Sequence, residues 1–84
     1  MALTTRLDAM DVVAELLVKE FDVPVDDVRP EAHLVRDLGL DSLGVLELVS
    51  ELEDRFDITV LDEEVGHMVV VQDAAEVLLA KVSP

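Results

Sequence analysis

The 84-residue chain contains no cysteine, so its own side chains can form neither a disulfide nor a thiolate site. Aromatic side chains are almost absent, because the chain has only Phe21 and Phe56 and lacks tryptophan and tyrosine. Basic residues are also scarce: 6 lysines and arginines stand against 20 acidic residues, and the formal net charge is −14. A surface of this sign repels phosphate backbones and anionic lipids. We therefore expect no binding to nucleic acid or membranes, and partners that carry basic patches.

Long apolar runs are missing too. No run approaches the length of about 18 residues that a membrane span needs. The first six residues lack the basic region and apolar core of a signal peptide, so we expect a cytoplasmic protein. Residues 1–84 suit a single domain with a thin core, and we expect a monomer. Apolar residues make up 51% of the chain, which is enough for a fold without metal or disulfide links.

Apolar residues recur with helical spacing, which predicts an all-α fold. We expect three main helices over about residues 5–20, 42–56 and 72–82, and a short helix over about 62–67. Thr4 or Thr5 can cap the first helix, and Asp8 completes a capping box with Thr5. The apolar stripe of that helix is expected to comprise Leu7, Met10, Val13, Ala14, Leu17 and Phe21.

A long connection, from about residue 22 to 41, separates the first two helices and contains Pro24, Pro30 and Gly39. Connections of this length in small domains tend to be functional or to hide short turns. The apolar residues expected to attach it to the core are Val28, Leu34, Val35, Leu38 and Leu40. Three consecutive valines at 69–71 have no partner strand, so we interpret them as a buried connector.

The second helix has two different faces. Its inner arc is expected to comprise Val45, Leu48, Val49, Leu52 and Phe56. The opposite arc comprises Leu43, Leu46, Glu47, Ser50 and Asp54, with Glu51 and Glu53 beside it. A face that only met solvent would not need two leucines. An exposed apolar pair surrounded by carboxylates indicates a docking surface for a basic partner.

Ser42, at the start of this helix, is the best candidate for chemistry, although Ser42 or its neighbour Asp41 can also simply cap the helix. A nucleophilic serine needs a base within hydrogen-bond reach, and the Gly-x-Ser-x-Gly pattern of hydrolases is absent. His33 and His67 are the only histidines, and we expect ordinary exposed or packed side chains at both positions. Ser42 is therefore predicted to be a modification site, and the protein not to be an enzyme.

The N-terminus of a helix favours a phosphate, because its free N–H groups and its dipole both attract an anion. A phosphodiester on Ser42 would therefore be accommodated there. A metal site is not expected: Asp37 and Asp41 precede the helix, but the alternating aspartates and terminal glutamate of a calcium loop are missing.

At this point the sequence resembles the acyl carrier proteins. The resemblance rests on Asp37–Leu43, which reads Asp-Leu-Gly-Leu-Asp-Ser-Leu, followed by Glu47–Leu48, Leu52–Ile58 and Val71–Ala74. It extends over nearly the whole chain and points to the discrete, type II form. It implies a bundle of three main helices and one short one.

By this resemblance, Ser42 would receive a 4′-phosphopantetheine arm from coenzyme A through a phosphopantetheinyl transferase. The arm's thiol would carry acyl groups as thioesters, which explains why the chain needs no cysteine. Cargo would be partly sheltered between the second and third helices. The other partners would be an acyltransferase, a ketosynthase or an adenylating enzyme.

The resemblance also bears on docking. Asp41 and Leu43 flank the modified serine, and Glu47, Glu53 and Asp54 match acidic positions that the family uses to meet basic partners. The helical wheel adds Glu51 and Leu46 to this surface.

Four residues depart from the family pattern. Val70 replaces a common capping threonine of the last helix, so that cap is expected to be lost or shifted. Leu61 replaces a frequent proline, Gly66 weakens the short helix, and Ser50 replaces a common methionine. These departures favour a role in polyketide or other specialised biosynthesis.

Three alternatives stay open. A fatty-acid synthase carrier fits the same pattern. An aminoacyl carrier is suggested by Gly44, although Leu40-Asp41 precedes Ser42 where peptidyl carriers usually show Gly-Gly-x-Ser. An unmodified acidic interaction module is the alternative of a different class.

Overall fold

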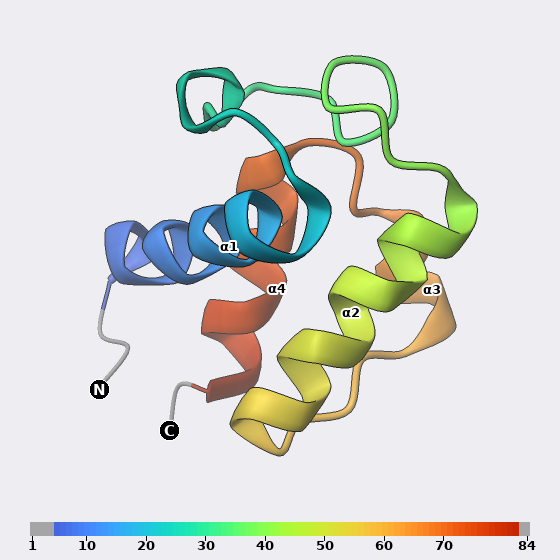
Figure 1. Ribbon diagram of the computed structural model, residues 1–84. Coiled ribbons are helices and arrows are strands. Elements are labelled where there is room, and N and C mark those ends of the chain that lie inside the picture. The colour runs from blue at the N-terminus through green and yellow to red at the C-terminus, as the bar shows by residue number, and fades with distance from the viewer. Residues whose placement is uncertain (1–4, 83–84) are drawn as a thin grey trace.

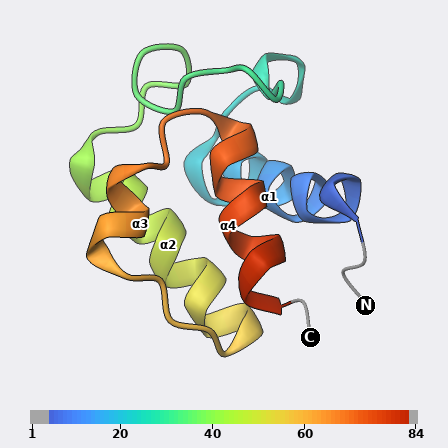
Figure 2. The same cartoon turned by 180° about the vertical axis from the view of Figure 1, so that it is seen from behind.

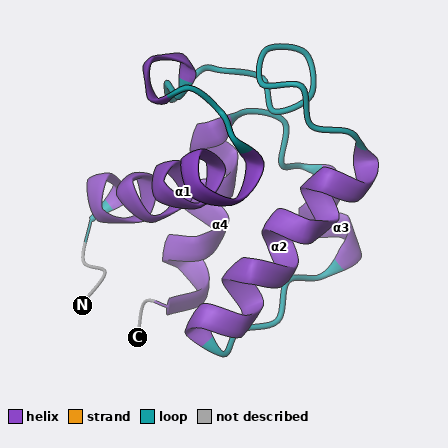
Figure 3. Ribbon diagram, in the orientation of Figure 1, coloured by secondary structure: helices purple, strands orange, loops and turns teal. Residues whose placement is uncertain are grey.

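The computed structural model describes residues 5–82, which fold into four α-helices and a short 3₁₀ helix joined by loops (Figures 1 and 3). The elements are α1 (Arg6–Phe21), the 3₁₀ helix η1 (Val25–Asp27), α2 (Ser42–Phe56), α3 (Asp62–Gly66) and α4 (Val71–Val82). No strand occurs between residues 5 and 82, where the β-pairing is an isolated bridge between His33 and Val70. The predicted all-α fold is confirmed, with α3 one residue shorter and α4 one residue longer than expected.

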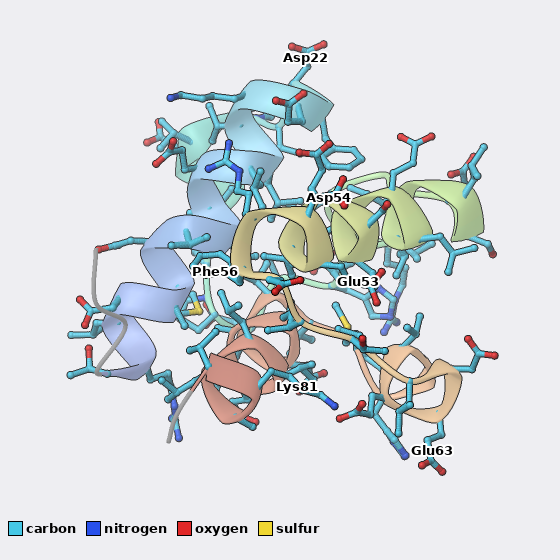
Figure 4. All side chains as sticks on the ribbon, turned by 90° about the horizontal axis from the view of Figure 1, so that it is seen from below. Asp22, Glu53, Asp54, Phe56, Glu63 and Lys81 are labelled. Atoms are coloured by element: carbon cyan, nitrogen blue, oxygen red, sulfur yellow. The ribbon has the colours of Figure 1, made fainter. Side chains whose placement is uncertain are left out.

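α1 packs most extensively against α4, and α2 lies beside this pair with α3 against it. The long connection between α1 and α2 crosses one end of the bundle (Figures 1 and 2). α2 begins on the side of the molecule away from the start of α1 and the end of α4, as both the front view and the view from below show (Figures 1 and 4). Ser42, the first residue of α2, therefore lies far from both ends of the described chain.

The core draws on all the long helices and on the connection. The buried side chains of α1 are Ala9, Val12, Val13, Leu16 and Leu17. The predicted stripe was wrong at Leu7, whose side chain is 75% exposed. At about 100° per residue, Leu7 lies roughly 120° from Val13 around the helix. The spacing of apolar residues along α1 indicated one continuous stripe. The face of α1 that packs against α4 is rotated around the helix axis relative to that stripe.

The start of α1 follows its sequence closely. The Thr5 hydroxyl accepts the Asp8 N–H at 3.2 Å, and the Asp8 carboxylate accepts the Thr5 N–H at the same distance. This capping box satisfies two backbone donors and confirms the predicted helix start. Thr4, the other candidate cap, lies outside the described residues. α1 and α2 end alike, each followed by an aspartate in the left-handed region: Asp22 (φ 56°) and Asp57 (φ 52°).

Backbone pairing and a few buried side chains hold the long connection on the core. The Leu34 N–H donates to the Val69 carbonyl, and the Val71 N–H donates to the Ala32 carbonyl, both at 3.0 Å. Leu34 and Leu40 are buried as predicted. Val35 was wrongly predicted to be buried: it is 48% exposed, because the turn that follows Leu34 directs it outward.

The valine run before α4 is only partly buried. Val69 is exposed and Val70 is half-buried, so the expected buried connector is wrong there, whereas Val71 is buried as the first residue of α4. The missing threonine cap is replaced by Asp73. Its Oδ2 accepts the N–H groups of Val69 and Val70 at 3.0 Å each, so the cap has shifted into the first turn.

Candidate functional site

Ser42 begins α2 and is exposed, but it does not cap the helix. The N-cap is Asp41, whose Oδ1 accepts the Gly44 N–H at 2.7 Å. Within residues 5–82, the Ser42 hydroxyl makes no hydrogen bond. Capping by Asp41 therefore leaves the serine oxygen free to be modified. A phosphate on Ser42 would share the helix N-terminus with the Asp41 carboxylate, which already occupies one of its free N–H groups.

The turn before Ser42 is built from backbone hydrogen bonds. The Leu40 N–H donates to the Leu34 carbonyl at 3.0 Å, and the Gly39 N–H donates to the Val35 carbonyl at 3.1 Å. Gly39 has a φ of 79°, a conformation that costs little only for glycine. A Cβ there would meet nothing within 4 Å, so backbone conformation rather than space requires this glycine.

Neither histidine hydrogen-bonds with Ser42. His33 organises the turn: its Nδ1 accepts the N–H groups of Val35 and Arg36 at 3.1 and 3.0 Å, and its own N–H donates to Asp37 at 2.8 Å. His67 is exposed at the end of α3. Within the described chain, Ser42 therefore has no histidine in position to act as its base.

An open apolar cleft of about 340 Å³ lies between α2 and α3 and reaches Ser42. Its lining comprises Ser42, Val35, Val45, Leu46, Val65 and Met68. Ser42 supplies the only side-chain polar atom in this lining. Four of these side chains were not predicted to belong to a site: Val35, Val45, Val65 and Met68. The exposed position of Val35 is explained here, because its side chain forms part of the cleft wall.

The outer face of α2 combines apolar and acidic side chains. Leu43 is 63% exposed and Leu46 is 52% exposed. Glu47 and Asp54 are exposed along the same helix, Asp41 precedes it, and Glu51 is half-buried. The helical wheel had placed Leu43, Leu46, Glu47 and Asp54 outward, and their exposure follows from the burial of the opposite arc.

Glu53 differs from the other carboxylates of α2. Its Oε2 accepts the Val60 N–H at 2.9 Å, in the segment that connects α2 to α3, and its side chain is half-buried. Figure 4 labels it beside its neighbour Asp54, which is exposed. Glu53 therefore has a structural role that its position on the wheel did not indicate.

Glu64 and Lys81 connect α3 to α4. Lys81 Nζ lies 2.7 Å from Glu64 Oε1, and the same oxygen accepts the Leu61 N–H at 2.9 Å. Figure 4 shows Lys81 extending from α4 toward α3. The hydrogen bond from Lys81, followed by that from Leu61, lowers the pKa of Glu64 below its ordinary value of 4.5. The sequence held one indication of this ion pair: Lys81 is the only lysine or arginine after Arg55, so it is the only such partner for the acidic residues of that segment.

Among residues 5–82, no group of three or more histidine, aspartate or glutamate side chains is placed to hold a metal ion. In that same part of the chain, no helix has the length and hydropathy that crossing a membrane requires.

Known proteins share both the sequence pattern and the fold of this chain. The family model described as "Phosphopantetheine attachment site" matches residues 11–77. The solved acyl carrier protein of Enterococcus faecalis is 31% identical, with a TM-score of 0.75, and the match covers 93% of this chain and 99% of that one. The acyl carrier protein of Thermotoga maritima is 26% identical, with a TM-score of 0.79, and the match covers 90% and 88% of the two chains.

The family match covers most of the chain, and both structural matches have the same helical fold. The family is a non-catalytic one whose members carry 4′-phosphopantetheine. The chain belongs to the acyl carrier protein family.

Proposed function

We propose that Ser42 is the attachment site of 4′-phosphopantetheine and that the protein carries acyl groups as thioesters on this arm. The observation that carries the proposal is the free, exposed Ser42 hydroxyl at the start of α2, with Asp41 as the cap. Ser42 Oγ takes the phosphopantetheinyl group from coenzyme A. The new oxygen–phosphorus bond forms as the bond to the adenosine bisphosphate leaving group breaks, and the serine proton passes to a base of the transferase.

The residues around Ser42 support this role. Gly39 and the His33 turn hold the loop, so the hydroxyl is presented at a fixed position. The cleft between α2 and α3 begins at Ser42 and has aliphatic walls, which suit an apolar chain better than a charged group, because a charge there would lose its hydration.

Attachment can be tested by intact mass. The protein is incubated with coenzyme A and a broad-specificity transferase, and one phosphopantetheine addition is expected. Ser42→Ala should abolish the addition, whereas Thr59→Ala, which removes an exposed hydroxyl after α2, should leave it intact. A well-folded protein that gains no mass would contradict the proposal and favour the unmodified interaction module.

We propose that partner enzymes dock on α2 through Asp41, Leu43, Leu46, Glu47, Glu51 and Asp54. Surface ion pairs are individually weak, commonly below about 1 kcal/mol, so their joint effect should lie in steering and partner choice. Replacing Glu47 and Asp54 with lysine should slow partner enzymes, and added salt should reduce the difference. Asp11→Lys on α1 is the control. Glu53 is kept unchanged, because its carboxylate holds Val60.

The pathway we propose is polyketide or other specialised biosynthesis in the cytoplasm, with the carrier acting as a monomer. Ser50 supports this, since it is exposed on the docking face at a position where fatty-acid carriers often have an apolar methionine. A fatty-acid synthase role and aminoacyl carriage are the competing possibilities. The mass of the acyl group on protein isolated from its host separates the three: a partly reduced or branched acyl group supports the proposal, and an amino acid or a saturated straight-chain acyl group contradicts it.

A further inference from the structure

A second set of hollows lies on the side of α2 that faces α1. The first, of about 290 Å³, lies beside the first turn of α2 and is lined in part by Phe21, Asp41, Gly44 and Glu47. The second, of about 240 Å³, continues along α2 and is lined by Glu20, Phe21, Glu47, Ser50 and Glu51. Phe21 and Glu47 line both, so the hollows form one groove, which we call the Phe21 groove.

Two glycines, Gly39 and Gly44, line the hollow beside the first turn of α2. At Gly44 a Cβ would lie 3.2 Å from Asp41 Oδ1 and 3.4 Å from the Leu40 side chain, so glycine also keeps the cap undisturbed. The wall that α1 contributes ends at Phe21, because the left-handed residue Asp22 turns the chain away.

The groove has an aromatic wall and carboxylate edges. Leu38, Leu40 and Leu43 add apolar surface, and no lysine or arginine lines either hollow. Four carboxylates line it: Glu20, Asp41, Glu47 and Glu51. None of the four takes part in an ion pair within residues 5–82.

This chemistry selects for arginine. A guanidinium group stacks on an aromatic ring and pairs with carboxylates at the same time, and its apolar stem covers apolar surface. A lysine ammonium lacks the planar group that stacks, and an apolar segment would leave the carboxylates unpaired. A partner segment that carries arginine therefore complements both the charge and the shape of the groove.

We propose that the Phe21 groove binds an arginine-bearing segment of the phosphopantetheinyl transferase, so that α1 contributes to the docking surface for this enzyme. The inference rests on the proposed attachment at Ser42. The transferase is the partner that acts on the Ser42 oxygen itself, and the groove is lined by both sequence neighbours of that residue, Asp41 and Leu43. Enzymes that act on the far end of the arm share the α2 residues of the groove in docking, but they do not need the α1 residues Glu20 and Phe21.

The test uses steady-state kinetics of phosphopantetheine transfer from coenzyme A, with the carrier as the varied substrate. Phe21→Leu keeps an apolar side chain but removes the ring. An exposed cation–π contact contributes about 0.5–1 kcal/mol, so KM should rise about two- to fivefold with kcat unchanged. Glu20→Gln should raise KM at low salt, with the effect fading as salt is added.

Two matched controls separate the groove from general effects. Phe56→Leu changes the only other aromatic residue, which lines neither hollow, and Asp11→Asn neutralises an exposed carboxylate of α1 outside the groove. Both should leave KM unchanged. Circular dichroism and thermal melting check that each variant is folded, and if Phe21→Leu is not, the surface substitution Glu20→Gln decides.

The outcomes distinguish this inference from the attachment proposal. If wild-type protein gains no phosphopantetheine, the attachment proposal fails and the inference falls with it. If wild-type protein is modified but Phe21→Leu and Glu20→Gln behave like their controls, only the groove is overturned. A rise in KM confined to the two groove variants supports it.

Discussion

α4 and α3 pack on the rest of the molecule by different means. α4 buries four side chains, Val71, Ala74, Ala75 and Leu78, and packs along α1. α3 has only five residues and none of its side chains is buried. A helix this short is not stable by itself. The comparison shows that apolar burial fixes one helix, whereas the other depends on polar contacts and on buried residues just outside it.

Those polar contacts are few and specific. Glu53 holds the Val60 N–H before α3, and Glu64 accepts both the Leu61 N–H and the ammonium group of Lys81. Val60 and Met68, on either side of α3, supply the nearest buried side chains. The cleft next to Ser42 lies between α2 and α3. One wall is therefore part of the core, whereas the other buries no side chain of its own, so we expect it to open at a smaller cost in free energy.

The largest effect should come from the core. Leu78→Ala removes a fully buried side chain of α4 and should lower the free energy of unfolding by about 2–5 kcal/mol. Val65→Ala in α3 removes a half-buried side chain and should cost clearly less. Urea unfolding of both variants measures the difference, and equal losses would show that α3 is as strongly packed as α4.

A smaller effect is expected at Glu53. Glu53→Ala leaves the Val60 N–H without its acceptor, which should lower the free energy of unfolding by about 1–3 kcal/mol. Asp54→Ala, which changes the exposed neighbouring carboxylate, should stay within about 0.5 kcal/mol of the wild type. If the two variants have the same stability, Glu53 is an ordinary surface residue and returns to the docking surface.

The smallest effect should be the pH dependence of α3. The pKa of Glu64 is lowered by Lys81 and Leu61, so the ionised carboxylate is favoured in the folded protein. Its contribution to stability is present above the ordinary value of 4.5 and is lost as the pH falls through the lower folded-state pKa. Lys81→Met should raise the pKa of Glu64 toward its ordinary value, which NMR titration of the side-chain carboxylate measures.

Lys19→Met provides the control for this titration. Lys19 pairs with Glu15 within α1, at 3.1 Å and on the exposed surface, so its removal should leave Glu64 and α3 unchanged. A Glu64 titration that is identical in Lys81→Met and wild-type protein would show that the ion pair does not hold α3 in solution.

Local patterns in the sequence predicted much of this architecture. The capping box at Thr5, the helical segments and the outward Leu43 and Leu46 all depend on residues within two turns of each other. The choice of Ser42 as a candidate modification site also came from local pattern, although the assignment of Asp41 rather than Ser42 as the cap needed the geometry.

What could not be predicted depends on contacts between distant segments. The apolar side of α1 is set by where α4 lies, which spacing along α1 does not reveal, and Leu7 was misplaced for that reason. Glu53 and Asp54 look equivalent as neighbouring acidic residues, and only the return of the chain at Val60 makes one of them structural. The Phe21 groove could not be predicted either, because α1 and α2 form it together and their relative position is not evident from the sequence.

The position of Ser42 relative to the two ends of the described chain has a practical consequence. α1 begins and α4 ends on the side of the molecule away from the start of α2 (Figures 1 and 4). An affinity tag, a solid support or a neighbouring domain joined at either end would lie away from Ser42. The carrier can therefore be immobilised or fused to a partner enzyme without covering the start of α2, and such a tether would raise the effective concentration of the pair.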